Sequence, residues 1–202
     1  MITAVVLDNG HPDLEKCLDS LWNQTVPVDI IVVAGPNTDV ELAQQYGEVT
    51  RPIKGYLNAR IHGFRKASSE VILSCDSDTI YHPEYAEAAL ECLKNAGLVR
   101  AGTVIPKKET PLGKVEILIF YKLLRLPYDH VLAMRKSVAD YLVKTVEFKY
   151  GREDIFTYVI KRAIPYKLCE NMIAFVDVPT YHFRKLVDGD YTTVVEALSS
   201  LL

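Results

Sequence analysis

The sequence predicts an α/β protein whose mainly parallel sheet is covered by helices on both faces. Its first hundred residues alternate short apolar runs with amphipathic stretches, a pattern typical of doubly buried strands and the helices that join them. The chain has 202 residues, the size of one domain. We therefore expect a single domain over 1–202, in which residues 106–202 add to the sheet begun by residues 1–105.

Strands are predicted wherever apolar, β-prone residues run together between turn signals. In the first half these runs are Ile2–Leu7, Asp29–Val33, Val71–Cys75 and Leu98–Ile105. The second half has two shorter β-like runs, Tyr166–Cys169 and Met172–Val178. One or two helices are predicted between consecutive strands of the first half.

Helices are predicted from apolar spacing and end signals. Pro12 fits the first turn of a helix whose inward face carries Leu14, Cys17, Leu18, Leu21 and Trp22. Thr38 and Glu41 have capping-box spacing and open a short helix that Gly47 closes. Further helices are expected at Tyr56–Ala67, Pro83–Gly97, Lys136–Val146, Arg152–Arg162 and from Thr192, with Pro106–Gly113 as a loop.

Bulk composition excludes several classes of protein. A net charge of −3 argues against nucleic-acid binding. No apolar stretch approaches 18 residues and no signal peptide is recognisable, so we expect a soluble, cytoplasmic protein. The four scattered cysteines are interpreted as buried thiols in a reducing compartment; they are Cys17, Cys75, Cys92 and Cys169.

Three short segments that directly follow predicted strands are candidates for a binding site. Asp8-Asn9, Ala34–Asn37 and Asp76–Asp78 should converge on one crevice, because ligands bind beyond the carboxyl ends of parallel strands. Two carboxylates one residue apart in extended chain point the same way and could share Mg²⁺ or Mn²⁺. On spacing alone the metal signal is weak, and an ordinary turn is the favoured interpretation of Asp-Ser-Asp.

Residues 54–78, KGYLNARIHGFRKASSEVILSCDSD, resemble the GT-A glycosyltransferases of family 2. That family's pattern is roughly G-x-x-x-A-R-x-x-G-x-x-x-A-x-x-E-x-I-x-x-x-D-x-D. The positions that match it are Gly55, Ala59, Arg60, Gly63, Ala67, Glu70, Ile72, Asp76 and Asp78. The opening residues also resemble the family's first strand, a helix ending in S-L-x-x-Q-T, and a second strand with a T-D tail.

The resemblance implies a metal-dependent, inverting glycosyltransferase with a GT-A fold. It would transfer a sugar from a UDP- or GDP-linked donor to a hydroxyl of a glycan, protein or lipid. Asp78 would bind the Mn²⁺ or Mg²⁺ ion directly, Asp76 would lie near the ribose and the metal's hydration shell, and Arg60 would face the nucleotide. The alternative without a role in binding is that Arg60 is a surface residue of its helix that pairs with an acid.

Two motifs of the second half extend this resemblance. Glu153-Asp154 resembles the family's E-D motif, in which Asp154 would be the general base; helix capping is the alternative. Later in the chain, His182 resembles a further metal ligand, and Arg184, assisted by Lys185, a diphosphate contact. A packed or surface His is the alternative for His182.

The chain departs from the family pattern where the nucleotide base would bind. Ala34-Gly35 replaces the usual acid pair, and Leu7-Asp8-Asn9 replaces the usual Thr-Tyr-Asn. Asp8 or Asp39 could substitute, or backbone groups could hold the base, so uridine and guanosine both stay open as donors.

Two rival functions remain. A nucleotidyltransferase would carry a Gly-rich basic loop after the first strand, which LDNGHPDLEKC lacks. A non-catalytic nucleotide-binding module on a degenerate glycosyltransferase scaffold is favoured by Ala34 and opposed by Asp78, Asp154 and His182. Finally, the amphipathic Val115–Arg125 could touch a membrane surface peripherally, although core packing is the favoured interpretation.

Overall fold

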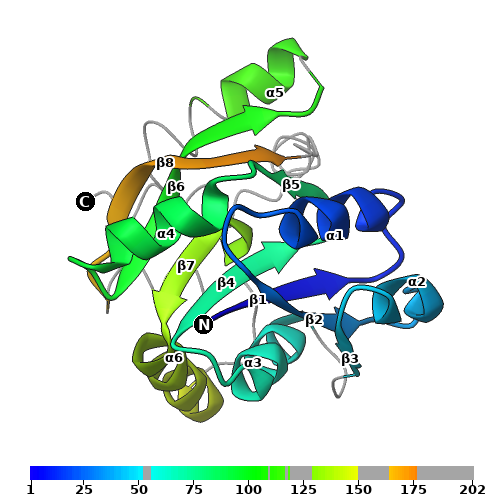
Figure 1. The fold of residues 1–202 in the computed structure, drawn as a ribbon, viewed down its shortest axis with the longest axis horizontal. Coiled ribbons are helices and arrows are strands. Elements are labelled where there is room, and N and C mark those ends of the chain that lie inside the picture. The colour runs from blue at the N-terminus through cyan, green and yellow to red at the C-terminus, as the bar shows by residue number, and fades with distance from the viewer. Residues whose placement is uncertain (52–55, 109, 117, 119–128, 150–163, 177–202) are drawn as a thin grey trace.

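The computed structural model describes residues 1–51, 56–108, 110–116, 118, 129–149 and 164–176. Within these residues eight strands form one sheet, in the order β3-β2-β1-β4-β7-β6-β8-β5, and helices lie on both of its faces (Figure 1). The predicted α/β class is therefore confirmed, with a sheet that is mixed in its second half.

The first half supplies a parallel block of four strands. They are β1 (Ile2–Asp8), β2 (Asp29–Ala34), β3 (Glu48–Thr50) and β4 (Val71–Asp76). In the register of this block, Leu7 pairs with both Val33 and Asp76. The carboxyl ends of β1, β2 and β4 consequently lie level, which brings the segments that follow them together.

The remaining strands extend the same sheet beyond β4. They are β5 (Thr79–Tyr81), β6 (Leu98–Pro106), β7 (Leu132–Arg135) and β8 (Lys167–Val176). β7 is antiparallel to β4 and β6, and β8 is parallel to β6 but antiparallel to β5. The two β-like runs predicted near residues 166–178 are one strand in the structure.

Gly102 explains how β6 and β8 stay paired over so many residues. The register between them shifts between Ala101 and Thr103, and a Cβ on Gly102 would lie 2.7 Å from the Cα of Glu170. Only glycine lets the two backbones approach this closely at the irregularity.

The helices occur close to their predicted positions. They are α1 (Leu14–Trp22), α2 (Val40–Gln44), α3 (Tyr56–Lys66), α4 (Tyr85–Leu93), α5 (Pro111–Glu116) and α6 (Lys136–Lys149), with a 3₁₀ turn η2 (Asp129–Val131) before β7. The prediction of a loop at Pro106–Gly113 is wrong for its last residues, because α5 begins at Pro111. The expected helices at Arg152–Arg162 and from Thr192 lie outside the described residues.

Two apolar layers hold the helices on the sheet. Ala4 and Val6 of β1 face the cluster that includes α1 and α4, whereas Val5 and Leu7 face the cluster that includes α3 and α6. Figure 1 shows the two helix pairs on opposite sides of the sheet. The alternation follows from the two-residue period of a strand, so β1 contributes side chains to both layers.

The Q-T dipeptide after α1 joins α1 to the start of α4. Gln24 accepts a hydrogen bond from the backbone N–H of Ala86 at 2.8 Å and donates to the carbonyl oxygen of His82 at 2.8 Å. The N–H of Thr25 donates to the carbonyl of Pro83 at 2.9 Å. The bond from Ala86 satisfies a first-turn N–H that a helix leaves unpaired, and the other two bonds hold the chain just before α4.

Two details of the helix predictions are corrected. Trp22 is 60% exposed and packs edge-on against Tyr46 instead of facing the core, because it lies beside the buried face of α1, just after Leu21. The cap of α2 is Asp39, whose carboxylate accepts from the N–H of Leu42 at 3.0 Å. Thr38, the predicted cap, donates instead to the carbonyl of Asp8 at 3.0 Å.

The cysteine prediction is half wrong. Cys92 of α4 and Cys169 of β8 form a disulfide, whereas Cys17 and Cys75 are free and buried. The paired residues are 77 positions apart, and only the packing of α4 over β8 brings them together. Their spacing in the sequence carried no sign of this.

In the described part of the chain, no helix is long and apolar enough to cross a membrane. Val115 and Leu118 are 43% and 49% exposed. The core packing favoured for Val115–Arg125 is therefore wrong for these two residues, and residues 119–125 lie outside the described ranges.

Candidate functional site

A cavity of about 710 Å³ opens at the carboxyl ends of β1, β2 and β4. Its walls come from the last residues of these strands and the segments that follow them, together with one residue after β3 and one on α3. The lining residues are Leu7, Asp8, Asn9, Gly10, His11, Pro12, Val33, Ala34, Gly35, Pro36, Arg51, Ala59, Asp76, Ser77 and Asp78. The predicted convergence of three polar segments on one crevice is confirmed.

The carboxylate of Asp8 shapes the loop that leads from β1 to α1. It is buried, and it accepts hydrogen bonds from the backbone N–H groups of Gly10 at 2.8 Å and His11 at 3.0 Å. Burial alone would raise the pKa of Asp8, but hydrogen bonds from Ser77, Gly10 and His11 outweigh it, and the net pKa is lowered. The carboxylate of Asp8 thus accepts hydrogen bonds from its own loop and from the side chains of Ser77 and Thr38.

The loop after β2 interlocks with the loop after β1. The N–H of Gly35 donates to the carbonyl oxygen of Asp8 at 2.7 Å. A Cβ on Gly35 would lie 2.4 Å from Oδ1 of Asn9, and a Cβ on Gly10, whose φ is +86°, would lie 2.6 Å from the carbonyl oxygen of Asn37. Both glycines are therefore needed for the two loops to fit together.

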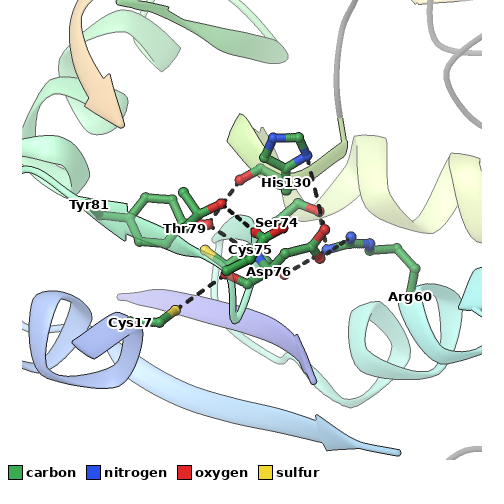
Figure 2. A network of polar contacts seen from close by, with 9 residues as sticks. Cys17, Arg60, Ser74, Cys75, Asp76, Thr79, Tyr81 and His130 are labelled. Atoms are coloured by element: carbon green, nitrogen blue, oxygen red, sulfur yellow. Dashed lines mark hydrogen bonds and ion pairs between the residues drawn. The ribbon is translucent and has the colours of Figure 1, made fainter. Parts of the chain in front are cut away.

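Arg60 holds Asp76 from the side of α3. Its side chain is fully buried, with Nη1 donating to the carbonyl of Cys75 at 2.8 Å and to Oγ of Ser74 at 3.1 Å. Nη2 donates to Oδ1 of Asp76 in an ion pair (Figure 2). The resemblance implied that Arg60 faces the nucleotide; in the structure its guanidinium holds Asp76, an acid that lines the pocket.

A tyrosine and a histidine complete the surroundings of Asp76. The buried hydroxyl of Tyr81 donates to the carbonyl of His130 at 2.9 Å and accepts from the N–H of Asp76 at 3.2 Å. Nδ1 of His130 lies 4.0 Å from Oδ2 of Asp76. Figure 2 shows Arg60 and His130 approaching this carboxylate from different elements. Sequence reasoning gave neither Tyr81 nor His130 a role, and no motif marked them.

Asp78 is the other acid of the Asp-Ser-Asp turn. It is partly exposed in the pocket wall, and its Oδ1 accepts from the hydroxyl of Thr79 at 2.9 Å. Among the described residues, no three His, Cys, Asp or Glu side chains gather as a metal-ligand cluster. Asp76 and Asp78 still fit Mg²⁺ or Mn²⁺, because such ions often take one or two carboxylates and complete their shell with water and substrate phosphate.

The remaining predicted site residues belong to the second half of the chain. Glu153, Asp154, His182, Arg184 and Lys185 all lie outside the described residues. Conversely, Arg51 and His11 line the cavity without having been predicted. Arg51 follows β3, a strand of three residues, which is too short to show the alternation that would have placed Arg51 at the same sheet edge.

The sequence model of Glycosyl transferase family 2 matches residues 5–156. No curated protein matches the sequence.

Several solved structures share the fold at low identity. The crystal structure of S. aureus TarS 1–349 in complex with UDP-GlcNAc is 15% identical, with a TM-score of 0.62 over 88% of this chain and 58% of that one. The complex of TarS 1–349 with UDP is 13% identical, with a TM-score of 0.65 over 96% of this chain and 65% of that one. This chain thus spans less than two thirds of the TarS chains it resembles.

Proposed function

Because this chain belongs to glycosyl transferase family 2, we propose that it transfers a sugar from a nucleotide-diphosphate donor to a hydroxyl acceptor on a glycan, protein or lipid. The observation that carries the proposal is the pocket itself. Its wall holds Asp76 and Asp78 beside the interlocked loops after β1 and β2. The similar fold of TarS, crystallised with UDP and with UDP-GlcNAc, supports a nucleotide-sugar donor and favours UDP over GDP.

In this proposal the chain's own residues position the diphosphate end of the donor. Asp78 and Asp76, with His182, would hold Mn²⁺ or Mg²⁺; such an ion supplies positive charge against the leaving diphosphate. Arg60 orients the Asp76 carboxylate, because its buried guanidinium donates to Oδ1 of that residue. Arg184 would add a second positive charge on the phosphate side.

The proposed reaction is a single displacement with inversion. The acceptor oxygen attacks the anomeric carbon, a new carbon–oxygen bond forms, and the bond from that carbon to the diphosphate oxygen breaks. The electron pair of the broken bond leaves with the diphosphate. Asp154 takes the acceptor proton, for which its carboxylate must be ionised and within hydrogen-bond reach.

The hydrogen bonds of the loop between β1 and α1 disfavour the nucleotidyltransferase alternative. A loop that grips a triphosphate offers its backbone N–H groups to the ligand. Here the N–H groups of Gly10 and His11 donate to Asp8, so they are already engaged by an anionic group of the protein.

Asp154→Asn tests the assigned base. We expect the variant to bind UDP as the wild type does but to lose transfer by about 100-fold or more, since general-base catalysis contributes typically 10²–10⁴-fold. Transfer from a UDP-sugar should be measured with a panel of acceptors, and the product anomer identified by NMR. Glu153→Gln, at the neighbouring acid, is the matched comparison. Full transfer by Asp154→Asn, or retention of the donor's anomeric configuration, would contradict the mechanism.

A further inference from the structure

The hydroxyl of Tyr81 lies inside the fold, between the end of β4 and the turn η2. It accepts a hydrogen bond from the backbone N–H of Asp76 at 3.2 Å and donates one to the carbonyl oxygen of His130 at 2.9 Å (Figure 2). Because Tyr81 is buried, both bonds form away from water, where the loss of a partner is costly. This hydroxyl therefore joins the backbone of a pocket acid to the second half of the chain.

The register of β4 and β7 explains why these two backbones meet. Their antiparallel pairing includes Ser74 opposite Leu132, and two residues further along the same register Asp76 would stand opposite His130. Opposite residues of an antiparallel pair carry their side chains on the same face, and Nδ1 of His130 lies 4.0 Å from Oδ2 of Asp76. The bridge through Tyr81 thus continues the pairing of β4 with β7 as far as the acid.

Tyr81 is itself held by three neighbouring elements. Its backbone N–H donates to Oγ of Ser20 on α1 at 3.1 Å, and its backbone pairs with Ala174 of β8. Its ring meets that of Tyr85 on α4 edge-on, with the ring centroids 4.8 Å apart. The hydroxyl is therefore a fixed point against which the backbone of Asp76 is set.

The carboxylate of Asp76 is flanked at both of its oxygens. Oδ1 accepts from Nη2 of Arg60, and Oδ2 faces the ring of His130. Together with the bond from its backbone N–H to Tyr81, Asp76 is held from α3, η2 and β5. A group held in this way needs less ordering when a ligand binds, which strengthens the binding.

We propose that Tyr81 is a positioning residue for the cation–diphosphate end of this pocket, and that its hydroxyl sets the Asp76 carboxylate where the cation and its hydration shell require it. The inference rests on the proposed function, because it assumes that a divalent cation and a nucleoside diphosphate bind beside Asp76 and Asp78. Tyr81 is buried and is not part of the described cavity wall, so it acts through Asp76.

Tyr85 provides a matched control for this hydroxyl. Tyr81 and Tyr85 are 2% and 0% exposed, belong to the same apolar layer, and touch each other. Within the described part of the chain, however, the hydroxyl of Tyr85 has no hydrogen-bond partner. Tyr81→Phe and Tyr85→Phe therefore remove the same atom from the same layer, but only Tyr81→Phe breaks the bridge.

The first measurement is the hydrogen exchange rate of the Asp76 amide, followed by NMR in the full chain without cation or nucleotide. In Tyr81→Phe we expect this amide to exchange about fivefold faster or more, the size of effect expected for one lost hydrogen bond. In Tyr85→Phe the exchange rate should equal that of the wild type.

The second measurement is calorimetric titration of UDP into the wild type and both variants, each with Mn²⁺ and with a chelator. In Tyr81→Phe the affinity with the chelator should be unchanged, and the strengthening by Mn²⁺ should fall by about fivefold or more. Tyr85→Phe should keep the full effect of Mn²⁺. A loss of stability alone would leave the ratio of the two affinities as it is in the wild type.

Ser20→Ala is a milder variant that keeps the test usable if Tyr81→Phe does not fold. It removes the acceptor of the Tyr81 N–H and should reduce the Mn²⁺ effect in the same direction, by about twofold. Wild-type exchange of the Asp76 amide in Tyr81→Phe, or a full Mn²⁺ effect in that variant, would overturn the inference and leave the proposed function intact. A wild type that binds UDP equally with and without Mn²⁺, or binds no UDP, would overturn both.

Discussion

Asp13 has a lysine partner on each side at the start of α1. Its carboxylate lies 2.6 Å from Nζ of Lys107, which follows β6, and 2.7 Å from Nζ of Lys16. Hydrogen bonds from Lys107 and then Lys16 are the largest causes that lower the pKa of Asp13 to about 2. The ion pair with Lys107 joins the pocket-lining loop before α1 to the distant end of β6.

This pKa predicts an acid-side loss of stability. Because the folded pKa lies below the ordinary value of 3.8, Asp13 contributes stability above about pH 4, and the contribution is lost as the pH falls towards 2. In urea unfolding between pH 2 and 6, Asp13→Asn should therefore be less stable than the wild type at pH 6, and the difference should shrink towards pH 2. Asp29→Asn, at an exposed acid, is the control. A difference that does not change with pH would contradict the assignment.

At the scale of single residues, the sequence located the acids of the pocket. It did not predict the side chains that surround them. Asp76 and Asp78 could be placed at the pocket because they directly follow an apolar strand. The ion pair between Arg60 and Asp76 could not, because Arg60 precedes Ile61 on a helix whose apolar spacing says nothing about a buried cation. Its partners are a carbonyl, a hydroxyl and a carboxylate of β4, and only the packing of α3 on the sheet brings them within reach.

The packing of α3 on the sheet depends on Gly63. A Cβ at this position would lie 2.2 Å from Cγ1 of Val5 and 2.9 Å from Cγ2 of Val33. Gly63→Ala should therefore push α3 away from β1 and β2 and destabilise the fold by about 1–3 kcal/mol, as overpacking does. It should also weaken nucleotide binding, because Arg60 lies one turn earlier on the same helix.

The measurement is the free energy of unfolding in urea together with UDP affinity. Lys66→Ala, at an exposed position of α3, should be within about 0.5 kcal/mol of the wild type. A Gly63→Ala variant with wild-type stability and affinity would show that α3 is not held this closely.

The disulfide joins α4 to β8 across a long stretch of chain. Cys92 and Cys169 are separated by 77 residues, so the bond restricts the unfolded chain strongly. Replacing both with alanine should cost about 2–4 kcal/mol in unfolding free energy. Dithiothreitol should lower the stability of the wild type by a similar amount and leave the double variant unaffected. Equal stability of the wild type with and without dithiothreitol would contradict the bond's role.

The elements that sequence reasoning missed are short or depend on distant partners. β3, β5 and β7 have three or four residues each, too few for a periodic signal. β8 was divided in two because Glu170 and Asn171 interrupt its apolar run, yet both belong to the strand beside the irregularity at Gly102. Longer apolar runs, such as β1, β2, β4 and β6, were predicted to within a residue or two at each end.

The whole molecule is a sheet whose level carboxyl ends create one crevice. Strands from both halves of the chain join that sheet, but the described walls of the cavity come from residues 7–78. Under the proposed function the acids in this wall would hold the cation, and Ala34-Gly35 departs from the family pattern where the base would bind. The central claim is that Asp78 makes nucleotide binding depend on a divalent cation.

That claim is tested most directly by titrating UDP into the wild type and Asp78→Asn, each with Mn²⁺ and with a chelator. We predict that Mn²⁺ strengthens binding to the wild type by about tenfold or more and has little effect on Asp78→Asn, because the neutral amide is a poor ligand for a hard cation. Asp29→Asn should respond to Mn²⁺ as the wild type does. Equal UDP affinity of the wild type with and without Mn²⁺, or an undiminished Mn²⁺ effect in Asp78→Asn, would contradict the account.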